Sequence, residues 1–231
     1  MMKFYYRWKF TALLIVILTL NMTRMLTVSD SQDPLILDLL GAAMLASATI
    51  SLCVNPRSRA IALSLGIPAV ILSLSRNLFS DLHLRHVALI GGRISSLLFL
   101  AFIICVILQT LLTQEKATFD HIAGAFCGYV LIGVLFAEAF CLLEVLAPHS
   151  YRWESLKQRG IDDQLQRWLM LEYFSFTTLT TLGFGDVVPE TPTARFLAIW
   201  EVMFGQFYLA VLVAGLVNLR GAQETTVSDK S

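Results

Sequence analysis

Charge is scarce in this chain of 231 residues: only 15% of them are Asp, Glu, Lys or Arg, and the net charge is zero. Soluble domains carry charge on about 25% of their residues. The zero net charge offers no attraction to a polyanion, so we expect no nucleic-acid partner. The signatures HExxH, GxSxG and GxxxxGK[ST] are also missing, and the sequence therefore predicts neither an enzyme nor a cofactor.

Hydrophobic residues, by contrast, make up 56% of the chain and occur in long runs. A run of about 20 apolar residues has the length of a helix that spans a bilayer. Prolines and charges separate the runs, where helices should end. The sequence therefore predicts an all-α membrane protein with six transmembrane helices, at about 9–27, 35–55, 60–79, 86–113, 120–147 and 194–218.

Basic residues near the first span predict the orientation. Lys3, Arg7 and Lys9 lie before this span or at its start, whereas Arg24 is the one basic residue near its end. Basic residues favour the cytoplasmic side, and the first helix usually dominates. The same basic start is also found in secretory signals, but no small-x-small cleavage pattern follows it, so we expect a retained helix. Six spans then place both termini in the cytoplasm.

The region between the fifth and sixth spans differs from the rest. Residues 148–166 are polar and charged, and 167–181 are apolar but too few to cross a bilayer as a helix. A segment that enters the membrane and returns needs protein or a water-filled cavity around its backbone. This constraint predicts a pore or a transport site.

A glycine-containing segment follows, Thr181-Leu182-Gly183-Phe184-Gly185-Asp186. Rings of backbone carbonyls from four chains can replace the water that a potassium ion sheds. Glycines at alternate positions permit the backbone conformations that turn carbonyls toward a narrow axis. The apolar residues before the segment would form a short pore helix, whose negative C-terminal end favours a cation.

The stretch TTLTTLGFGD resembles the filter pattern T-x-x-T-x-G-[YF]-G-D of potassium channels. The resemblance covers about 120–220, the module of outer helix, re-entrant pore helix with filter loop, and inner helix. It implies a six-transmembrane, one-pore-loop subunit of the bacterial type without a charged voltage sensor. Such a subunit acts as a homotetramer in the lipid bilayer and passes K+ as the permeant ion, without a cofactor.

The resemblance also implies roles for individual residues. Carbonyls that bind K+ belong to Thr181, Leu182, Gly183 and Phe184, and Gly185 completes the filter. Residues that support the filter are Asp186, Tyr173, Thr177, Thr180 and Glu138, with the Tyr173 phenol as the expected partner of Asp186. Whether Glu138 or Glu144 serves the filter stays open. Gly205, twenty residues past Gly185, is the candidate gating hinge.

By the same resemblance, residues 1–115 form a four-helix sensor-like or scaffold domain, 116–220 the pore domain and 221–231 a short cytoplasmic tail. Arg93 is the only arginine within the fourth span, and steep voltage sensing needs several charges. We therefore expect the first four helices to scaffold the pore.

Two alternatives stay open. Leu182 and Phe184 depart from the commonest filter, so a weakly selective cation channel is one alternative. The other is a non-conducting regulatory or scaffold subunit of the membrane.

Overall fold

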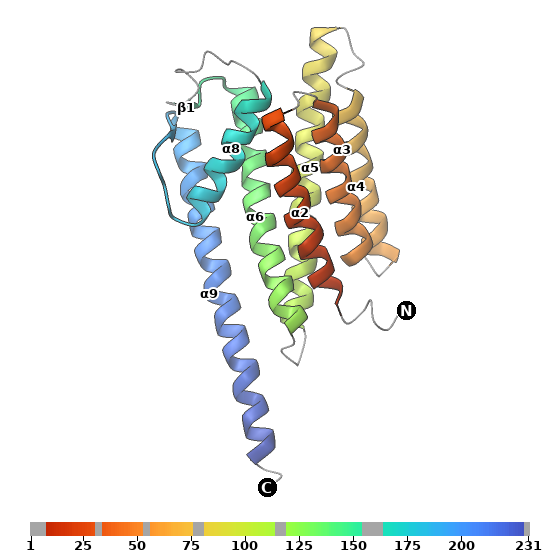
Figure 1. Cartoon of the computed structure of the whole chain (residues 1–231), viewed down its shortest axis with the longest axis vertical. Helices are drawn as coiled ribbons and strands as arrows, with labels where there is room; N and C mark the ends of the chain where they lie inside the picture. Colours follow the sequence, from red (N-terminus) through yellow and green to blue (C-terminus); the bar gives the residue numbers. More distant parts are fainter. Residues whose placement is uncertain are drawn as a thin grey trace.

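The computed structural model describes residues 8–30, 34–52, 56–75, 81–113, 119–153 and 164–228. Six long helices lie side by side in Figure 1: α2 (Lys9–Asp30), α3 (Pro34–Leu52), α4 (Pro56–Ser75), α5 (Leu82–Leu112), α6 (Phe119–Leu146) and α9 (Pro192–Ser228). Between α6 and α9 come strand β1 (Tyr151–Trp153), the shorter helix α8 (Gln164–Leu179) and strand β2 (Val187–Pro189).

The helices begin where local chemistry predicts. Pro34, Pro56 and Pro192 are the first residues of α3, α4 and α9. Proline suits this position because its missing N–H has no partner within the helix and its φ is already helical. The helix bounds agree with the expected spans to within a few residues, except that α9 continues to Ser228, beyond the expected end near 218. Lys3, Arg7 and residues 229–231 of the expected tail lie outside the described residues.

Among the described residues, four helices are long and apolar enough to cross a membrane. They comprise residues Pro56–Ser75, His83–Leu112, Phe119–Leu146 and Pro192–Leu212. The described apolar stretches of α2 and α3, Lys9–Thr23 and Leu39–Ser51, are shorter. A mostly helical protein with four candidate membrane-spanning helices is therefore confirmed.

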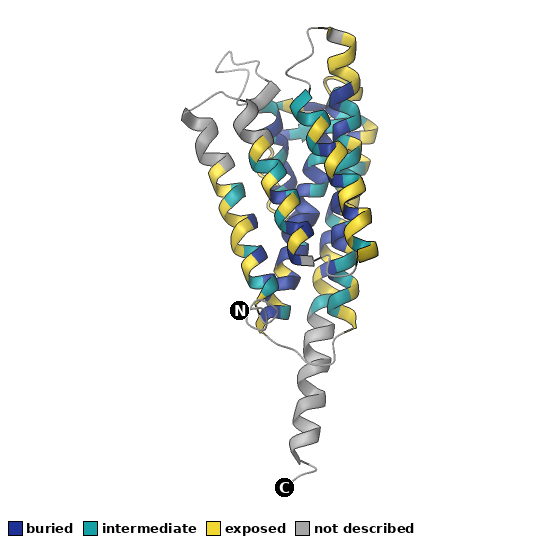
Figure 2. Ribbon diagram, turned by 90° about the vertical axis from the view of Figure 1, so that its right-hand side faces the viewer, coloured by how far each residue is buried: buried dark blue, intermediate teal, exposed yellow. Residues whose placement is uncertain are grey.

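Helix α6 is the centre of the structure. In its apolar stretch 61% of the residues are buried, compared with 28% in α5 and 17% in α9. Figure 2 shows buried residues along the middle of the bundle and exposed residues along the outward faces. Small residues on α6 let its neighbours approach closely: a Cβ at Gly124 would lie 2.8 Å from the Phe10 ring, and one at Gly128 would lie 2.1 Å from the Tyr208 hydroxyl.

The start of α2 is held by α6. The buried Asp120 carboxylate accepts hydrogen bonds from the Thr11 N–H at 2.8 Å and from the Thr11 hydroxyl at 2.9 Å. The first N–H groups of a helix have no partner within the helix, and the positive end of its dipole favours a carboxylate. A side chain 109 residues away thus caps α2 and joins the first helix to the predicted pore domain.

The two short strands were not expected from the sequence. They pair antiparallel, with Tyr151 opposite Pro189 and Trp153 opposite Val187. Strand β2 begins directly after Asp186, so this pairing fixes the chain at one end of the glycine-containing segment. Helix α8 descends between α6 and α9, and the chain then returns to the level at which α8 began (Figure 1).

Candidate functional site

Helix α8 ends in a turn that sets the conformation of the next segment. The Leu182 N–H donates to the Thr177 carbonyl at 2.8 Å. The Thr181 N–H donates to the Thr178 carbonyl at 2.9 Å. These are the two bonds of a Schellman motif, in which the residue after the helix is left-handed. That residue is Thr181, with a φ of 61°, although its Cβ raises the energy of this conformation.

Left-handed backbone recurs at every second residue of the segment. The φ angle is 61° at Thr181, 54° at Gly183 and 80° at Gly185, and it is not positive at the residues between them. Alternating signs of φ align the N–H groups of successive peptides on one side of the chain, which leaves their carbonyls on the other side. A Cβ at Gly183 or Gly185 would meet no atom within 4 Å, so glycine is favoured by the backbone angle and not by lack of space.

The last carbonyls of α8 all have partners. The Thr177 carbonyl accepts a second bond, from the Gly183 N–H at 3.1 Å. The Leu179 carbonyl accepts a bond from the Tyr129 hydroxyl of α6 at 3.1 Å. A helix end with free buried carbonyls would be unstable, so these contacts stabilise both the helix end and the segment that it holds. Nothing in the sequence pattern singles out Tyr129 for this role.

The expected supporting residues lie near the segment. Thr177 is buried and supports it through its carbonyl, while its hydroxyl donates to the Phe174 carbonyl at 2.9 Å. The exposed Thr180 donates its hydroxyl to the Phe176 carbonyl at 2.6 Å. Both hydroxyls thus bond back to α8 itself.

Tyr173 of α8, which lies outside the four candidate spans, interacts with two residues of the segment. Desolvation raises the pKa of its phenol, and a hydrogen bond to the Asp186 carboxylate raises it further. The ring is parallel to that of Phe184, with an interplanar angle of 2° and 6.4 Å between centroids. Asp186 also accepts a bond from the Val187 N–H at 3.1 Å. The pairing of Tyr173 with Asp186 as a support of the filter stays a prediction.

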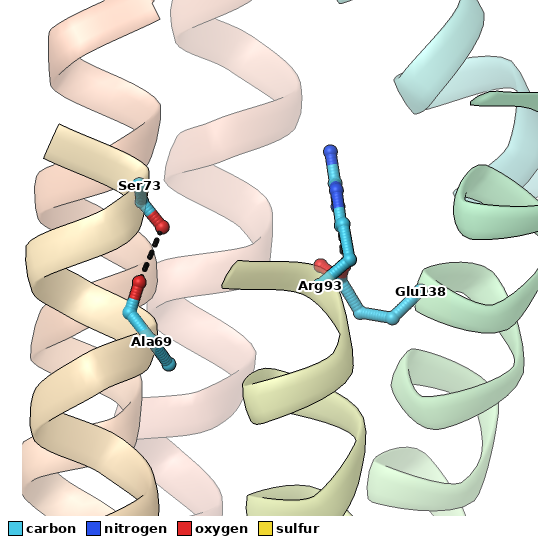
Figure 3. A network of polar contacts seen from close by, with 4 residues as sticks. All are labelled: Ala69, Ser73, Arg93 and Glu138. Carbon is cyan, nitrogen blue, oxygen red and sulfur yellow. Dashed lines mark hydrogen bonds and ion pairs between the residues drawn. The ribbon is translucent and has the colours of Figure 1, made fainter. Parts of the chain in front are cut away.

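Glu138, which was expected to support the filter, contacts a different part of the structure. Its carboxylate accepts a hydrogen bond from Arg93 of α5, and the two side chains point toward one another in Figure 3. The Arg93 guanidinium also lies 6.0 Å from the centre of the Trp168 ring in α8. The arginine of the fourth expected span is therefore held by an acid of α6, and the pair joins α5 to α6.

Glu144 has a different set of partners, at the end of α6. Its buried carboxylate accepts the His149 N–H at 3.1 Å and the Ser150 N–H at 3.0 Å. The Ser150 carbonyl in turn accepts the Glu190 N–H at 2.8 Å, next to β2. Of the two acids left open from the sequence, Glu144 is the one whose contacts reach the chain that follows Asp186.

Gly205 lies within the continuous helix α9 and faces α8. A Cβ there would lie 2.5 Å from a methyl group of Leu179, which is fully buried. Gly205 is therefore a point of close approach between α9 and the end of α8. Its role as a gating hinge stays a prediction.

Glu201 of α9 is fully buried, and no role was predicted for it from the sequence. The available signal was an acid inside an apolar run, which is costly in a membrane and marks a functional candidate. Within the described part of the chain, no group of three or more His, Cys, Asp or Glu side chains is placed to hold a metal ion.

Comparison with known proteins agrees with this geometry. Residues 129–219 match the sequence model of a family described as "Ion channel". The chain is 41% identical to "Two-pore potassium channel 5" of Arabidopsis thaliana over 46 residues. These residues make up 20% of this chain and 11% of that protein. Over 106 residues it is 33% identical to "Potassium channel subfamily K member 4" of Rattus norvegicus. The aligned region covers 42% of this chain and 24% of that protein.

A third relative is the "Voltage-gated potassium channel" of Aeropyrum pernix, 31% identical over 105 residues, which cover 46% of this chain and 30% of that protein. The chain thus spans less than a third of the length of these relatives. No solved structure matches the chain. The family match and the apolar helices indicate a membrane protein. Residues 129–219, which contain α8 and the alternating glycine segment, therefore match the ion-channel family model, and the chain is similar in part to these potassium channels.

Proposed function

We propose that this chain is the subunit of a homotetrameric, potassium-selective channel that conducts K+ passively across the cell membrane. The observation that carries the proposal is the alternation of left-handed backbone at Thr181, Gly183 and Gly185, directly after a capped helix end. This conformation aligns successive peptide groups, as a row of cation-binding carbonyls requires. Carbonyls of Thr181, Leu182, Gly183 and Phe184 would bind the ion, and the Thr181 hydroxyl would close the innermost site.

The exposure of this segment supports assembly into a ring. Leu182 and Phe184 are 61% and 67% exposed in the single chain. One chain supplies one row of carbonyls, and an ion that has shed its water needs carbonyls on all sides. Four copies around an axis would complete the site, since closed cyclic symmetry is the usual arrangement of identical subunits. The tetramer would also cover the exposed apolar side chains next to the filter.

The topology that we infer has six spans, with α8 and the filter entering between α6 and α9. In Figure 1, α2 begins and α9 ends at the same end of the bundle, which fits termini on one side of the membrane. Basic residues before the first span assign that side to the cytoplasm. The re-entrant backbone is tolerable because α8 packs against α6 and α9 and its last carbonyls are hydrogen-bonded.

Ion flux through the purified chain in liposomes tests the proposal. We expect K+ flux in the wild type and its loss in Gly183→Ala, because Ala disfavours a φ of 54° although its Cβ would meet no atom. Gly92→Ala is the matched control: the residue is helical and its added Cβ would make only ordinary contacts, at 3.4 Å or more. Retained flux in Gly183→Ala would refute the filter assignment.

The same preparation separates the alternatives. A reversal potential near zero with K+ on one side and Na+ on the other would indicate a weakly selective cation channel. Absence of flux from a folded tetramer in lipid would indicate a non-conducting regulatory or scaffold subunit. We expect a reversal potential close to the potassium equilibrium value.

A further inference from the structure

Glu201 is a buried acid that the proposed conduction path does not use. Its side chain on α9 is fully buried and contacts the hydroxyl of Ser175 on α8, which is also fully buried. The second carboxyl oxygen, Oε2, has no hydrogen-bond partner. No basic side chain in the described part of the chain pairs with Glu201. An ionised carboxylate in such a place is strongly disfavoured.

The Ser175 hydroxyl contacts two oxygens at once. Besides Glu201, it lies 2.7 Å from the backbone carbonyl of Gly133 on α6. A serine hydroxyl carries one hydrogen, so it can donate to only one of these oxygens. If Glu201 were ionised, one of the two contacts would bring oxygens together without a hydrogen. If Glu201 is protonated, it donates to Ser175 and Ser175 donates to Gly133.

The groups that face Glu201 do not change this conclusion. From α6 the titratable group in electrostatic range is the Tyr129 phenol, which donates to the Leu179 carbonyl. From β1 it is the phenol of Tyr151. Strand β2 consists of two valines and a proline and contributes no titratable side chain. Neutral phenols cannot balance a carboxylate charge, so they leave the protonated form of Glu201 favoured.

We propose that Glu201 carries a proton at neutral pH and thereby ties α9 to α8, and that loss of this proton releases the contact and lowers ion flux. The effect on flux rests on the proposed channel function. Ser175 lies two residues before Thr177, whose carbonyl holds the N–H groups of Leu182 and Gly183. Glu201 is therefore a positioning residue: it acts on the filter through α8 and does not touch the ion.

Infrared spectroscopy of the full chain in lipid tests the proton itself, without any need for conduction. We expect the carbonyl band of a protonated carboxylic acid at neutral pH, its loss at alkaline pH, and its absence in Glu201→Gln. Glu190→Gln is the control, because that acid is half exposed and pairs with Arg152. Absence of the band from the wild type at neutral pH, or its persistence in Glu201→Gln, would overturn the proposal.

The pH dependence of K+ flux tests the consequence. The protonated fraction of a single acid falls about tenfold for each pH unit above its transition, and wild-type flux should fall with it. Glu201→Gln should conduct at neutral pH, since its amide can donate to Ser175, and its flux should stay constant over the same alkaline range. Glu201→Ala should lose flux at neutral pH. If the K+ flux of Glu201→Gln declined in the same way at alkaline pH, the proposed role of the Glu201 proton would be refuted.

The two experiments also distinguish failure of this inference from failure of the proposed function. If the wild type conducts no K+ at any pH, the channel function is refuted, and the infrared band still decides whether Glu201 is protonated. If the wild type conducts K+ and the infrared band is missing, the channel function is supported and the proposed role of Glu201 is refuted.

Discussion

Thr181 combines a strained backbone with the hydroxyl proposed to close the innermost ion site, and substitutions can separate the two. Its φ of 61° is left-handed, which costs an L-residue about 1–2 kcal/mol. Thr181→Gly and Thr181→Ala both remove the hydroxyl, but only glycine relieves the strain. We expect the glycine variant to be more stable than the alanine variant by roughly 1 kcal/mol per chain, after allowing for the flexibility of glycine in the unfolded state.

Ion selectivity should depend on the Thr181 hydroxyl and not on the backbone strain at this residue. Both variants should have a reversal potential shifted toward the sodium equilibrium value, whereas Thr181→Ser keeps the hydroxyl and should stay close to the wild type. Thermal unfolding in detergent measures the stability difference, and bi-ionic reversal potentials in bilayers measure selectivity. Equal stability of the glycine and alanine variants would contradict the strained turn, and wild-type selectivity in both would contradict the role of the hydroxyl.

Three further predictions concern contacts that hold the pore region in place. Gly128→Ala should destabilise the fold by about 2–4 kcal/mol in thermal unfolding, because its Cβ would lie 2.1 Å from the Tyr208 hydroxyl. Tyr208→Phe should cost only about 1 kcal/mol, because it removes a single hydrogen bond, to the Ala125 carbonyl. Asp120→Ala should lower unfolding stability by about 2–3 kcal/mol by uncapping α2, with a smaller loss in Asp120→Asn. Tyr173→Phe should make K+ flux decay faster during sustained recording, because it removes the hydrogen bond to Asp186 but keeps the ring beside the filter; an unchanged decay would show that this bond does not hold the filter.

Much of the local structure follows from the sequence alone. Prolines and charges between apolar runs predict the helix bounds, because a helix start depends on the residues of its own first turn. The glycine spacing in 181–186 predicts the unusual backbone for the same reason, since the permitted φ at each position depends on its own side chain. Both features depend on residues within a few positions of one another.

The partners of the buried polar groups were decided only by the tertiary structure. Glu138 contacts Arg93, 45 residues away, and not the filter predicted from its motif. Tyr129 reaches Leu179 across 50 residues, and Asp120 caps a helix that begins more than a hundred residues earlier. Sequence spacing cannot rank such partners, because any of several acids in apolar runs could in principle face any neighbouring helix.

The glycine-containing segment shows how the two levels combine. The residues from Thr181 to Asp186 identify the segment, and the glycines permit its conformation. What fixes that conformation is the Schellman turn of α8, the Tyr129 hydroxyl, the Tyr173 phenol and the β1–β2 pairing. The sequence by itself determined where the backbone could adopt left-handed conformations at alternate positions, because backbone freedom is a local property. Only the tertiary structure decided what holds that segment in place and brought the buried Glu201 against Ser175, because these contacts require helices distant in the chain to pack together.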